Sequence, residues 1–398
     1  MPILAALVAA CASLDRLPAV PLAETSQALF LGLPNARFVI GEAAPAAMAA
    51  EFRRAYEREV AYRRTASGAD AVLGRANYLA ISGGSDNGAF GAGLLVGWSE
   101  RGDRPVFKAV TGVSTGALSA PFAFLGPEYD SALAAVYTDS DAADIFEKRS
   151  MLAAISADAM ADTAPLYRLI SRHVDDRLVG EIAREYGRGR LLMVGTTNLD
   201  AGRPVVWNIG AIAASGHPMA VEAIRKILLA SASVPGVFPP VMFDIEIGGK
   251  HFQEMHGDGG ATAQAFLYPP TISLRGAGTV PARSRTVYMI RNGKLFQDWK
   301  ETERKTLAIA GRAVSTMIGS SGLNDMFRIY ATARRDGLAY RLAYIDNDFS
   351  EPYRGPFDRA YMTALFEYAR AKARAGYPWR HAPPGLEQQA GPRTAVQR

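Results

Sequence analysis

Cysteine is nearly absent from this chain of 398 residues, in which Cys11 is the single example. An intrachain disulfide is therefore excluded. No stretch reaches the ~18 consecutive apolar residues of a membrane-spanning helix, and no arginine stripe with interleaved aromatic residues indicates nucleic-acid binding. The hydrophobic fraction of 49% is enough for one large α/β domain with additions, or for two domains.

Histidine is also scarce, and none of the histidines has a sequence context typical of a catalytic base. The five are His173, His217, His251, His256 and His381. No cluster of histidine, cysteine and carboxylate residues has the spacing of a metal site, so we predict no catalytic metal and no cofactor. This scarcity favours a carboxylate as the base of any catalytic pair.

Glycine is abundant, and it marks the stretch around which the chain is organised. Residues 78–81 predict a short buried parallel strand, and a helix is predicted from Ala89 onward. Between them, the loop 83–88 permits positive φ and brings backbone N–H groups close to a ligand. A glycine loop that opens a helix binds anions, because its free N–H groups and the positive end of the helix dipole point the same way. The loop lacks the Gly-Lys-[Ser/Thr] ending of a nucleotide-binding P-loop, which leaves another phosphate or a transient oxyanion as the anion.

A second strand–turn–helix pattern follows it in the chain. Residues 106–111 predict a strand and residues 117–125 a helix, with Gly-Val-Ser-Thr-Gly at 112–116 between them. The flanking glycines let the chain turn tightly and leave room beside the hydroxyl of Ser114, as in the G-x-S-x-G nucleophile elbow. The pentapeptide alone arises by chance in a glycine-rich chain. Its position between strand and helix, directly after an anion loop, predicts that Ser114 is a nucleophile rather than an ordinary helix cap.

A serine needs a base to become a nucleophile, and a carboxylate stands among glycines far downstream. Residues 254–261 read E-M-H-G-D-G-G-A, in which a tight turn would present the carboxylate of Asp258. From these residues alone, a turn aspartate without a catalytic role is an equal alternative. His256, two residues before Asp258, could tune it.

Together these motifs resemble those of the patatin-like phospholipase family. The loop 83–88 is similar to that family's oxyanion loop, residues 112–116 to its nucleophile elbow, and residues 258–260 to its D-G-[AG] motif. Residues 230–240, which read A-S-A-S-V-P-G-V-F-P-P, also resemble the family's segment before the aspartate. The motifs occur in the right order and spacing between residues 77 and 263.

The resemblance implies a three-layer α/β/α patatin-like fold around a mostly parallel sheet, with extra helices. It implies a lipid acyl hydrolase of the phospholipase A, lysophospholipase or esterase type, acting on a lipid or other ester. Ser114 would attack the ester carbonyl, and Asp258 would take the serine proton and return it to the leaving alcohol. The other implied site residues are Gly83, Gly84, Ser85, Asp86 and Gly88 for the oxyanion hole, Gly112 and Gly116 for the elbow, and Gly259 and Gly260 for the D-G-G motif.

The oxyanion loop departs from the family's G-G-G-x-[KR]-G pattern at two positions. Ser85 replaces the third glycine, and Asn87 replaces the basic residue. A serine preserves the backbone donors if its φ is negative. The lost charge motivates one alternative function, a lipid-binding lipoprotein of this fold with little or no activity. The other alternative is an α/β-hydrolase esterase with a Ser-Asp-His triad, for which only His381 follows Asp258 in the chain.

The rest of the chain predicts the following organisation. Residues 12–76 form an N-terminal linker (13–33) and a helix (43–64), residues 77–290 the catalytic domain, residues 291–380 a helical extension packed on it, and residues 381–398 a disordered tail. Further helices are expected at residues 131–137, 141–148, 165–173, 178–186, 219–231, 299–318, 323–334 and 358–375.

The N-terminal residues bear on where in the cell the protein is located. Residues 3–10 are a short apolar run that ends at Cys11, and residues 1–11 resemble a bacterial lipoprotein signal with its lipid-modified cysteine. No Lys or Arg precedes the run, unlike in a typical signal. We expect the cell envelope, with a lipid anchor at Cys11, if the signal is real, and the cytoplasm otherwise. The net charge of +5 fits contact with an anionic membrane surface, and equally fits scattered surface arginine. The sequence does not define the oligomeric state.

Overall fold

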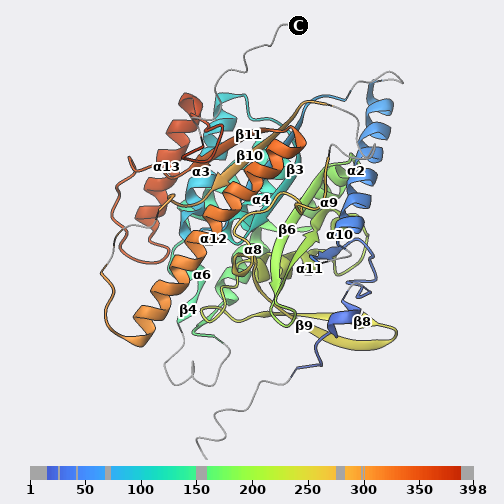
Figure 1. Ribbon diagram of the computed structural model, residues 1–398, viewed down its shortest axis with the longest axis horizontal. Helices are drawn as coiled ribbons and strands as arrows, with labels where there is room; N and C mark the ends of the chain where they lie inside the picture. Colours follow the sequence, from blue (N-terminus) through green and yellow to red (C-terminus); the bar gives the residue numbers. More distant parts are fainter. Residues whose placement is uncertain are drawn as a thin grey trace, which may run out of the picture.

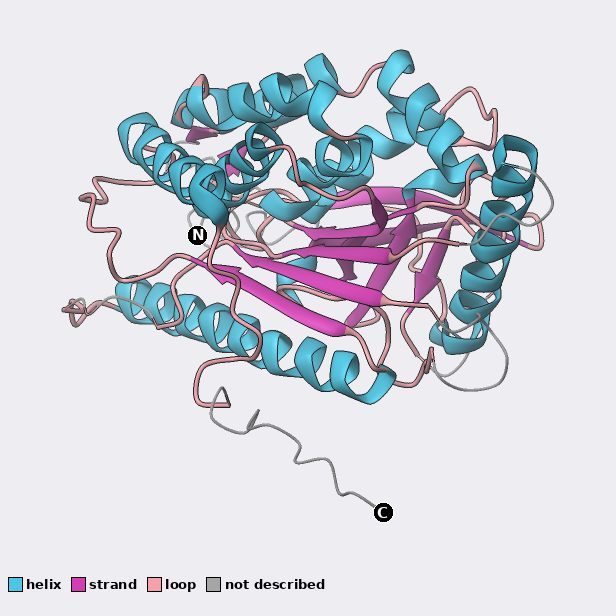
Figure 2. Ribbon diagram, turned by 90° about the horizontal axis from the view of Figure 1, so that it is seen from above, coloured by secondary structure: helices cyan, strands magenta, loops and turns pink. Residues whose placement is uncertain are grey.

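The computed structural model describes residues 16–25, 27–41, 44–67, 73–148, 159–274, 283–296, 299 and 301–386. The predicted signal at residues 1–11, with Cys11, and residues 387–398 of the predicted tail lie outside these ranges. Within them the chain forms one large mixed sheet with helices on both faces (Figure 1, Figure 2). The predicted α/β fold class is therefore confirmed. Among the described helices, none is long and apolar enough to cross a membrane.

Parallel strands form the middle of the sheet, in the order β6-β3-β2-β10-β11. They are β2 (Ala76–Ile81), β3 (Phe107–Val113), β6 (Leu191–Asn198), β10 (Arg285–Arg291) and β11 (Ala339–Tyr344). Their near-continuous apolar runs suit strands that are covered on both faces, and every position of β6 is buried. Because these strands are parallel, their C-terminal ends share one edge of the sheet, where the predicted loops meet.

Antiparallel strands continue the sheet beyond β6. They are β7 (Arg203–Asn208), which pairs with β6, β1 (Arg37–Val39), which pairs with β7, and the hairpin of β8 (Val241–Ile247) with β9 (Lys250–Asp258). Strand β9 pairs with the end of β6, so that Asp258 lies opposite Thr196. This pairing brings Asp258 to the C-terminal edge of the parallel strands.

Helices of the described residues divide between the two faces of the sheet according to the core that they share. One face carries α3 (Gly88–Arg101), α4 (Thr115–Leu125), α5 (Asp130–Thr138), α8 (Ala164–His173), α9 (Asp176–Gly187), α11 (Ala220–Ser231) and α13 (Arg359–Gly376). The other face carries α2 (Ala44–Ser67) and α12 (Thr306–Asp336). Shorter elements are α6 (Ala142–Ile145), α10 (Ile209–Ala213), β4 (Glu147–Lys148), β5 (Ala161–Asp162) and the 3₁₀ turns at Leu22–Glu24, Ser85–Asn87, Pro127–Tyr129 and Gly259–Ala261.

The predicted boundary at residue 290 does not mark a structural division. Strand β11 extends the central sheet beside β10, and α13 packs tightly on α3. A Cβ on Gly93 would lie 2.1 Å from the carbonyl oxygen of Phe366, so the two helices touch backbone to backbone. Residues 291–380 therefore complete the central sheet and its helical layer instead of packing on them as an extension.

Three other expectations need correction. The helix predicted at 141–148 stops at Ile145, because Phe146 is extended (φ −153°) and leads into β4. The two helices predicted at 299–318 and 323–334 are the single helix α12, whose packing by Met326 and Ile329 outweighs the ~1 kcal/mol that each helical glycine costs. The described residues of the predicted linker, 16–25 and 27–33, include the 3₁₀ turn Leu22–Glu24 and pack on the domain, since Arg16 pairs with Asp200 and Phe30 packs on Trp207.

Candidate active site

Ser114 occupies a sharp turn between β3 and α4. Its backbone has φ +54° and ψ −127°, a conformation that serine adopts only under strain. The neighbouring glycines permit this turn: a Cβ on Gly112 would lie 2.4 Å from the carbonyl oxygen of Gly116, and a Cβ on Gly116 would lie 2.4 Å from that of Ile81. The geometry is that of the strand–turn–helix elbow predicted from the glycine spacing.

The side chain of Ser114 meets the carboxylate of Asp258. A side-chain hydrogen bond joins the two residues, and both are at least nine-tenths buried. Burial raises the pKa of Asp258 to about 6, although the hydrogen bonds from Ser114 and from the N–H of Gly260 favour the charged form. The Gly260 N–H lies 2.6 Å from Oδ1 of Asp258. A carboxylate that is buried without a cation and bonded to a serine is suited to accept the serine proton.

The segment 230–240 braces both residues of this pair. The N–H of Ser114 donates to Oγ of Ser231 (3.0 Å), and Ser231 donates in turn to the carbonyl oxygen of Gly195 (2.6 Å). The N–H of Asp258 donates to the carbonyl oxygen of Ser233 (2.7 Å). Sequence reasoning had noted the segment but assigned no role to either serine, because these contacts join residues far apart in the chain.

Replacing Ser231 with alanine should destabilise the protein by about 1–3 kcal/mol, because the buried N–H of Ser114 would lose its acceptor. We also expect slower reaction at Ser114, since the elbow would be less firmly held. Urea unfolding measures the first effect. Ser233→Ala is the matched control, because its carbonyl still accepts the N–H of Asp258. Equal losses in the two variants would argue against a specific role for Ser231.

The predicted oxyanion loop lies beside the pair. A Cβ on Gly83 would come 3.2 Å from Cβ of Ser114, so the loop lies directly beside Ser114. The N–H of Gly83 already donates to the carbonyl oxygen of Gln264 (2.9 Å). Among the described residues, no acceptor is found for the N–H groups of Gly84 and Ser85. These two groups, rather than that of Gly83, are the ones left to bind a ligand.

Ser85 does not meet the condition of a negative φ under which serine replaces glycine without strain. Its φ is +54°, so serine stands in a left-handed conformation that glycine adopts more easily. The 3₁₀ turn Ser85–Asn87 and the start of α3 hold it there. Ser85 therefore holds a backbone conformation that favours glycine, at the cost of local strain.

Residues in the C-terminal part of the chain form hydrogen bonds to two side chains of the oxyanion loop. The carboxylate of Asp86 accepts the N–H of Phe357 (3.1 Å), and Oδ1 of Asn87 accepts the hydroxyl of Tyr361 (2.8 Å). Burial raises the pKa of Asp86, although hydrogen bonds from Phe357 and Tyr353 favour the charged form. Asn87, in place of a basic residue, therefore ties the loop to α13.

Further residues missed by sequence reasoning fix the loop from β10 and α12. The N–H of Asn292 donates to Oγ of Ser82 (2.8 Å), and its side-chain amide donates to the carbonyl oxygen of Ser82 (2.9 Å). Oδ2 of Asp325 accepts the N–H groups of Gln264 (2.6 Å) and Ala265 (3.1 Å). Through Gln264, which accepts the N–H of Gly83, α12 is connected to the oxyanion loop. No local motif marks these residues.

The histidines do not complete a triad. His256 is fully buried, and its ring is hydrogen-bonded to Oγ1 of Thr196 (2.9 Å) and to Glu254 (3.0 Å). It therefore supports Glu254, which forms an ion pair with Arg37. His381, the histidine after Asp258 in the chain, accepts from Arg341. Among the described residues, no histidine is hydrogen-bonded to Ser114 or Asp258, and no group of histidine, cysteine and carboxylate side chains could hold a metal ion.

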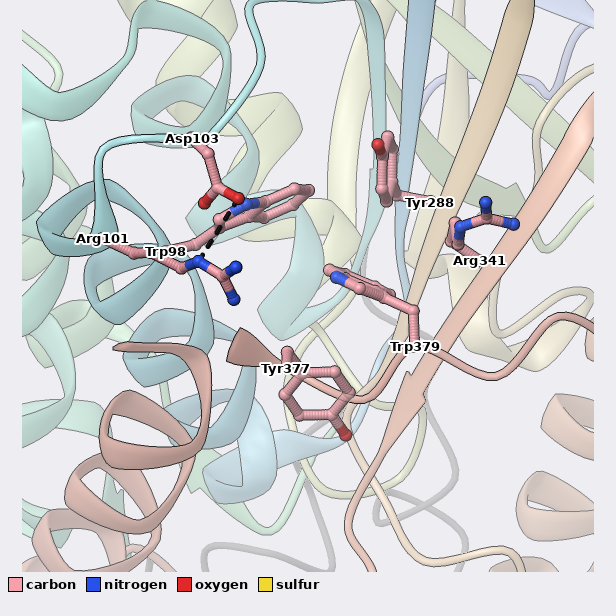
Figure 3. Close-up of a pocket in the computed structure, with 7 residues that line it drawn as sticks. All are labelled: Trp98, Arg101, Asp103, Tyr288, Arg341, Tyr377 and Trp379. Carbon is pink, nitrogen blue, oxygen red and sulfur yellow. Dashed lines mark ion pairs between the residues drawn. The ribbon is translucent and has the colours of Figure 1, made fainter. Parts of the chain in front are cut away.

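A hollow of about 250 Å³ lies elsewhere in the fold, where α3 ends beside β10 and β11 (Figure 3). It is lined by Trp98, Arg101, Asp103, Tyr288, Arg341, Tyr377 and Trp379. The Trp98 ring lies 4.9 Å from the centroids of both Tyr288 and Trp379, so the aromatic rings pack on one another. The single carboxylate that lines the hollow belongs to Asp103, which forms an ion pair with Arg101 (3.3 Å). The residues that line the hollow therefore include no serine beside a carboxylate, in contrast to the sheet edge that holds Ser114 and Asp258.

Comparison with solved structures finds proteins of distant sequence. VipD from Legionella pneumophila aligns with a TM-score of 0.37 and 10% identity, over 76% of this chain and 67% of VipD. A chain of the complex between SpcU and ExoU, from the type III secretion system of Pseudomonas aeruginosa, aligns with a TM-score of 0.30 and 14% identity. That alignment covers 76% of this chain and 52% of the other.

Sequence comparison is more specific. No curated protein sequence matches the chain. The family model described as patatin-like phospholipase matches residues 79–268, a range that contains the oxyanion loop, the elbow, the bracing segment and Asp258. These residues form a domain of the patatin-like phospholipase family.

Proposed function

We propose that this protein hydrolyses carboxylic esters of lipids with Ser114 as nucleophile and Asp258 as its base. The observation that carries the proposal is the hydrogen bond between a strained, elbow-mounted serine and a buried carboxylate whose pKa is raised to about 6. A base of that pKa is charged at neutral pH, yet binds a proton more readily than an ordinary aspartate does. The family match supports a lipid as the substrate.

The reaction runs in two steps. Oγ of Ser114 bonds to the ester carbonyl carbon while its proton moves to Asp258, and the alcohol leaves with that proton. Water then attacks the acyl-serine, Asp258 takes the water proton, and the same proton returns to Ser114 as the carboxylic acid departs. In both steps negative charge develops on the former carbonyl oxygen. The N–H groups of Gly84 and Ser85 are the donors that support its stabilisation there.

An active-site-directed fluorophosphonate tests the nucleophile directly. We expect one label per chain, attached to Ser114 by peptide mass spectrometry, and no label after Ser114→Ala. Because Asp258 must be charged, the labelling rate should rise with pH through about 6 and then level off. Ser119→Ala is a suitable control, because Ser119 is fully buried in the next turn of α4. A folded protein that takes no label would favour the alternative of a lipid-binding protein without catalysis.

A further inference from the structure

Gln264 lies between the two halves of the candidate active site, although it belongs to neither motif. One half is the turn 258–261, here called the base turn because it carries Asp258, and the other is the oxyanion loop 83–88. Gln264 is only 8% exposed, so its side chain is enclosed by these segments and not by solvent. A buried carboxamide at this place needs a physical explanation.

The carboxamide of Gln264 fills space that a glycine of each half leaves open. A Cβ on Gly260 would lie 2.2 Å from Nε2 of Gln264 and 2.9 Å from Oδ1 of Asp258. A Cβ on Gly83 would lie 2.6 Å from Oε1 of Gln264 and 3.2 Å from Cβ of Ser114. One end of the carboxamide is therefore beside the base, and the other end is beside the nucleophile.

Three hydrogen bonds fix Gln264 in this position. Its Nε2 donates to the carbonyl oxygen of Gly260 (3.1 Å), and its own carbonyl oxygen accepts the N–H of Gly83 (2.9 Å). Its backbone N–H donates to Oδ2 of Asp325 (2.6 Å). A carbonyl oxygen only accepts, so the amide nitrogen of the side chain must be the atom that faces Gly260. One residue thus connects the base turn, the oxyanion loop and α12.

The contact with Gly260 affects the base directly. The N–H of Gly260 donates to Oδ1 of Asp258 (2.6 Å), while its carbonyl oxygen accepts from Gln264. Among the described residues, no other donor to that carbonyl oxygen is found. Because Ser114 and Gly260 are the residues hydrogen-bonded to the Asp258 carboxylate, the orientation of Gly260 helps to decide where the carboxylate points.

The proposed hydrolysis needs the base and the oxyanion donors at one fixed spacing. Asp258 takes the proton of Ser114 while negative charge develops at the oxyanion loop. The base turn follows β9 and the loop follows β2, and these two strands are not neighbours in the sheet. A misplacement of about 1 Å in such an arrangement can cost about 10²-fold in rate. A side chain bonded to one half and packed on the other holds this spacing.

Packing alone would not require an amide here. Burying a polar side chain costs stability unless the side chain is hydrogen-bonded. Methionine is unbranched, has about the same length and would fill the gap without that cost. The hydrogen bond from the carboxamide to the base turn therefore favours a positioning role over simple space filling.

We propose that Gln264 is a positioning residue for the hydrolysis, whose carboxamide holds the base turn at a fixed distance from the oxyanion loop. It acts through Asp258 and does not touch the reacting atoms. This inference rests on the proposed function, because Gln264 can position a base only if Asp258 is the base of Ser114.

Gln264→Met tests the proposal, since it removes the carboxamide and leaves the backbone bonds to Gly83 and Asp325 in place. On a soluble ester we expect kcat to fall about 10–100-fold, with KM within about threefold because the base does not bind the substrate. Gln264→Asn, one carbon too short to reach Gly260, should show the same loss, and it replaces the methionine variant if that variant does not fold. Gln27→Met is the matched control, because Gln27 is exposed, and its kcat should stay within about twofold.

A double-mutant cycle separates positioning from a general structural effect. In the background of Asp258→Asn, Gln264→Met should change the residual rate less than about threefold, because no base is left to position. Equal fractional losses in the two backgrounds, or a wild-type kcat in the folded Gln264 variants, would overturn the inference and leave Ser114 and Asp258 in their proposed roles. A wild-type protein whose Ser114 takes no fluorophosphonate label would refute the proposed function, and this inference with it.

Discussion

Asp258→Asn should slow ester hydrolysis by about 10²–10⁴-fold and, above pH 7, make the protein more stable. The loss of rate follows because an amide cannot accept the proton of Ser114. The gain in stability follows from burial. A pKa of about 6 instead of 3.8 means that ionising Asp258 is about 3 kcal/mol harder in the folded protein than in the unfolded chain.

The sign of the pH dependence is specific to a carboxyl group whose pKa is raised by folding. Below about pH 3 Asp258 is protonated in both states, and the folded protein bears no penalty. Between about pH 4 and pH 6 the unfolded chain is ionised while the folded protein is not, so the folded protein progressively loses up to about 3 kcal/mol of stability, and the loss levels off above pH 6. Asparagine is neutral at every pH and can still accept the N–H of Gly260, so the variant avoids this loss.

Urea unfolding of the wild type and the variant at pH 4 and pH 8 measures this difference. We expect a difference below about 1 kcal/mol at pH 4 and about 3 kcal/mol in favour of the variant at pH 8, with other titrating groups cancelling. Ser114→Ala is the control, because it removes activity while keeping the buried carboxyl group. A difference that does not change with pH would contradict a raised pKa at Asp258. Full activity of Asp258→Asn would remove Asp258 from the mechanism.

The elements of the site that follow local rules were predictable from the sequence. The strands before Gly83 and Gly112, and the helices after Gly88 and Thr115, follow from apolar runs broken by glycine. The structure places the two loops on neighbouring parallel strands, β2 and β3, as their short separation in the chain requires. Asp258 reaches the same edge through the pairing of β9 with β6, which no local pattern showed.

Residues that support the site from a distance were not predictable in this way. Gln264 accepts the N–H of Gly83, and Asp325 in turn accepts the N–H of Gln264. Asn292 is hydrogen-bonded to Ser82, the residue before the oxyanion loop. None of the three belongs to a recognisable local sequence motif. The continuity of α12 was also missed, since separate helices were predicted at 299–318 and 323–334. Gly322, between them, lies against Arg291, whose Nη1 would be 2.3 Å from a Cβ at that position.

Gly84→Ala should lower kcat by about 10²–10³-fold with little change in KM. A Cβ at this position would lie 2.1 Å from the carbonyl oxygen and 2.6 Å from Cβ of Asn292. Asn292 cannot yield easily, because its N–H and its side-chain amide are both bonded to Ser82. The loop must move instead, and the N–H groups of Gly84 and Ser85 move with it. A donor aimed at the developing oxyanion acts mainly in the transition state, which is why kcat falls rather than substrate affinity.

Gly293→Ala is the matched control for this change, because it lies next to Asn292 and a Cβ there would meet nothing within 4 Å. We expect its kcat to stay within twofold of the wild type. Steady-state kinetics on a soluble monomeric ester measure the chemistry without a contribution from lipid binding, and thermal unfolding checks that Gly84→Ala remains folded. If folded Gly84→Ala kept the wild-type kcat, the oxyanion donors would lie outside this loop. Ser85, despite its strained backbone, would then have no part in catalysis.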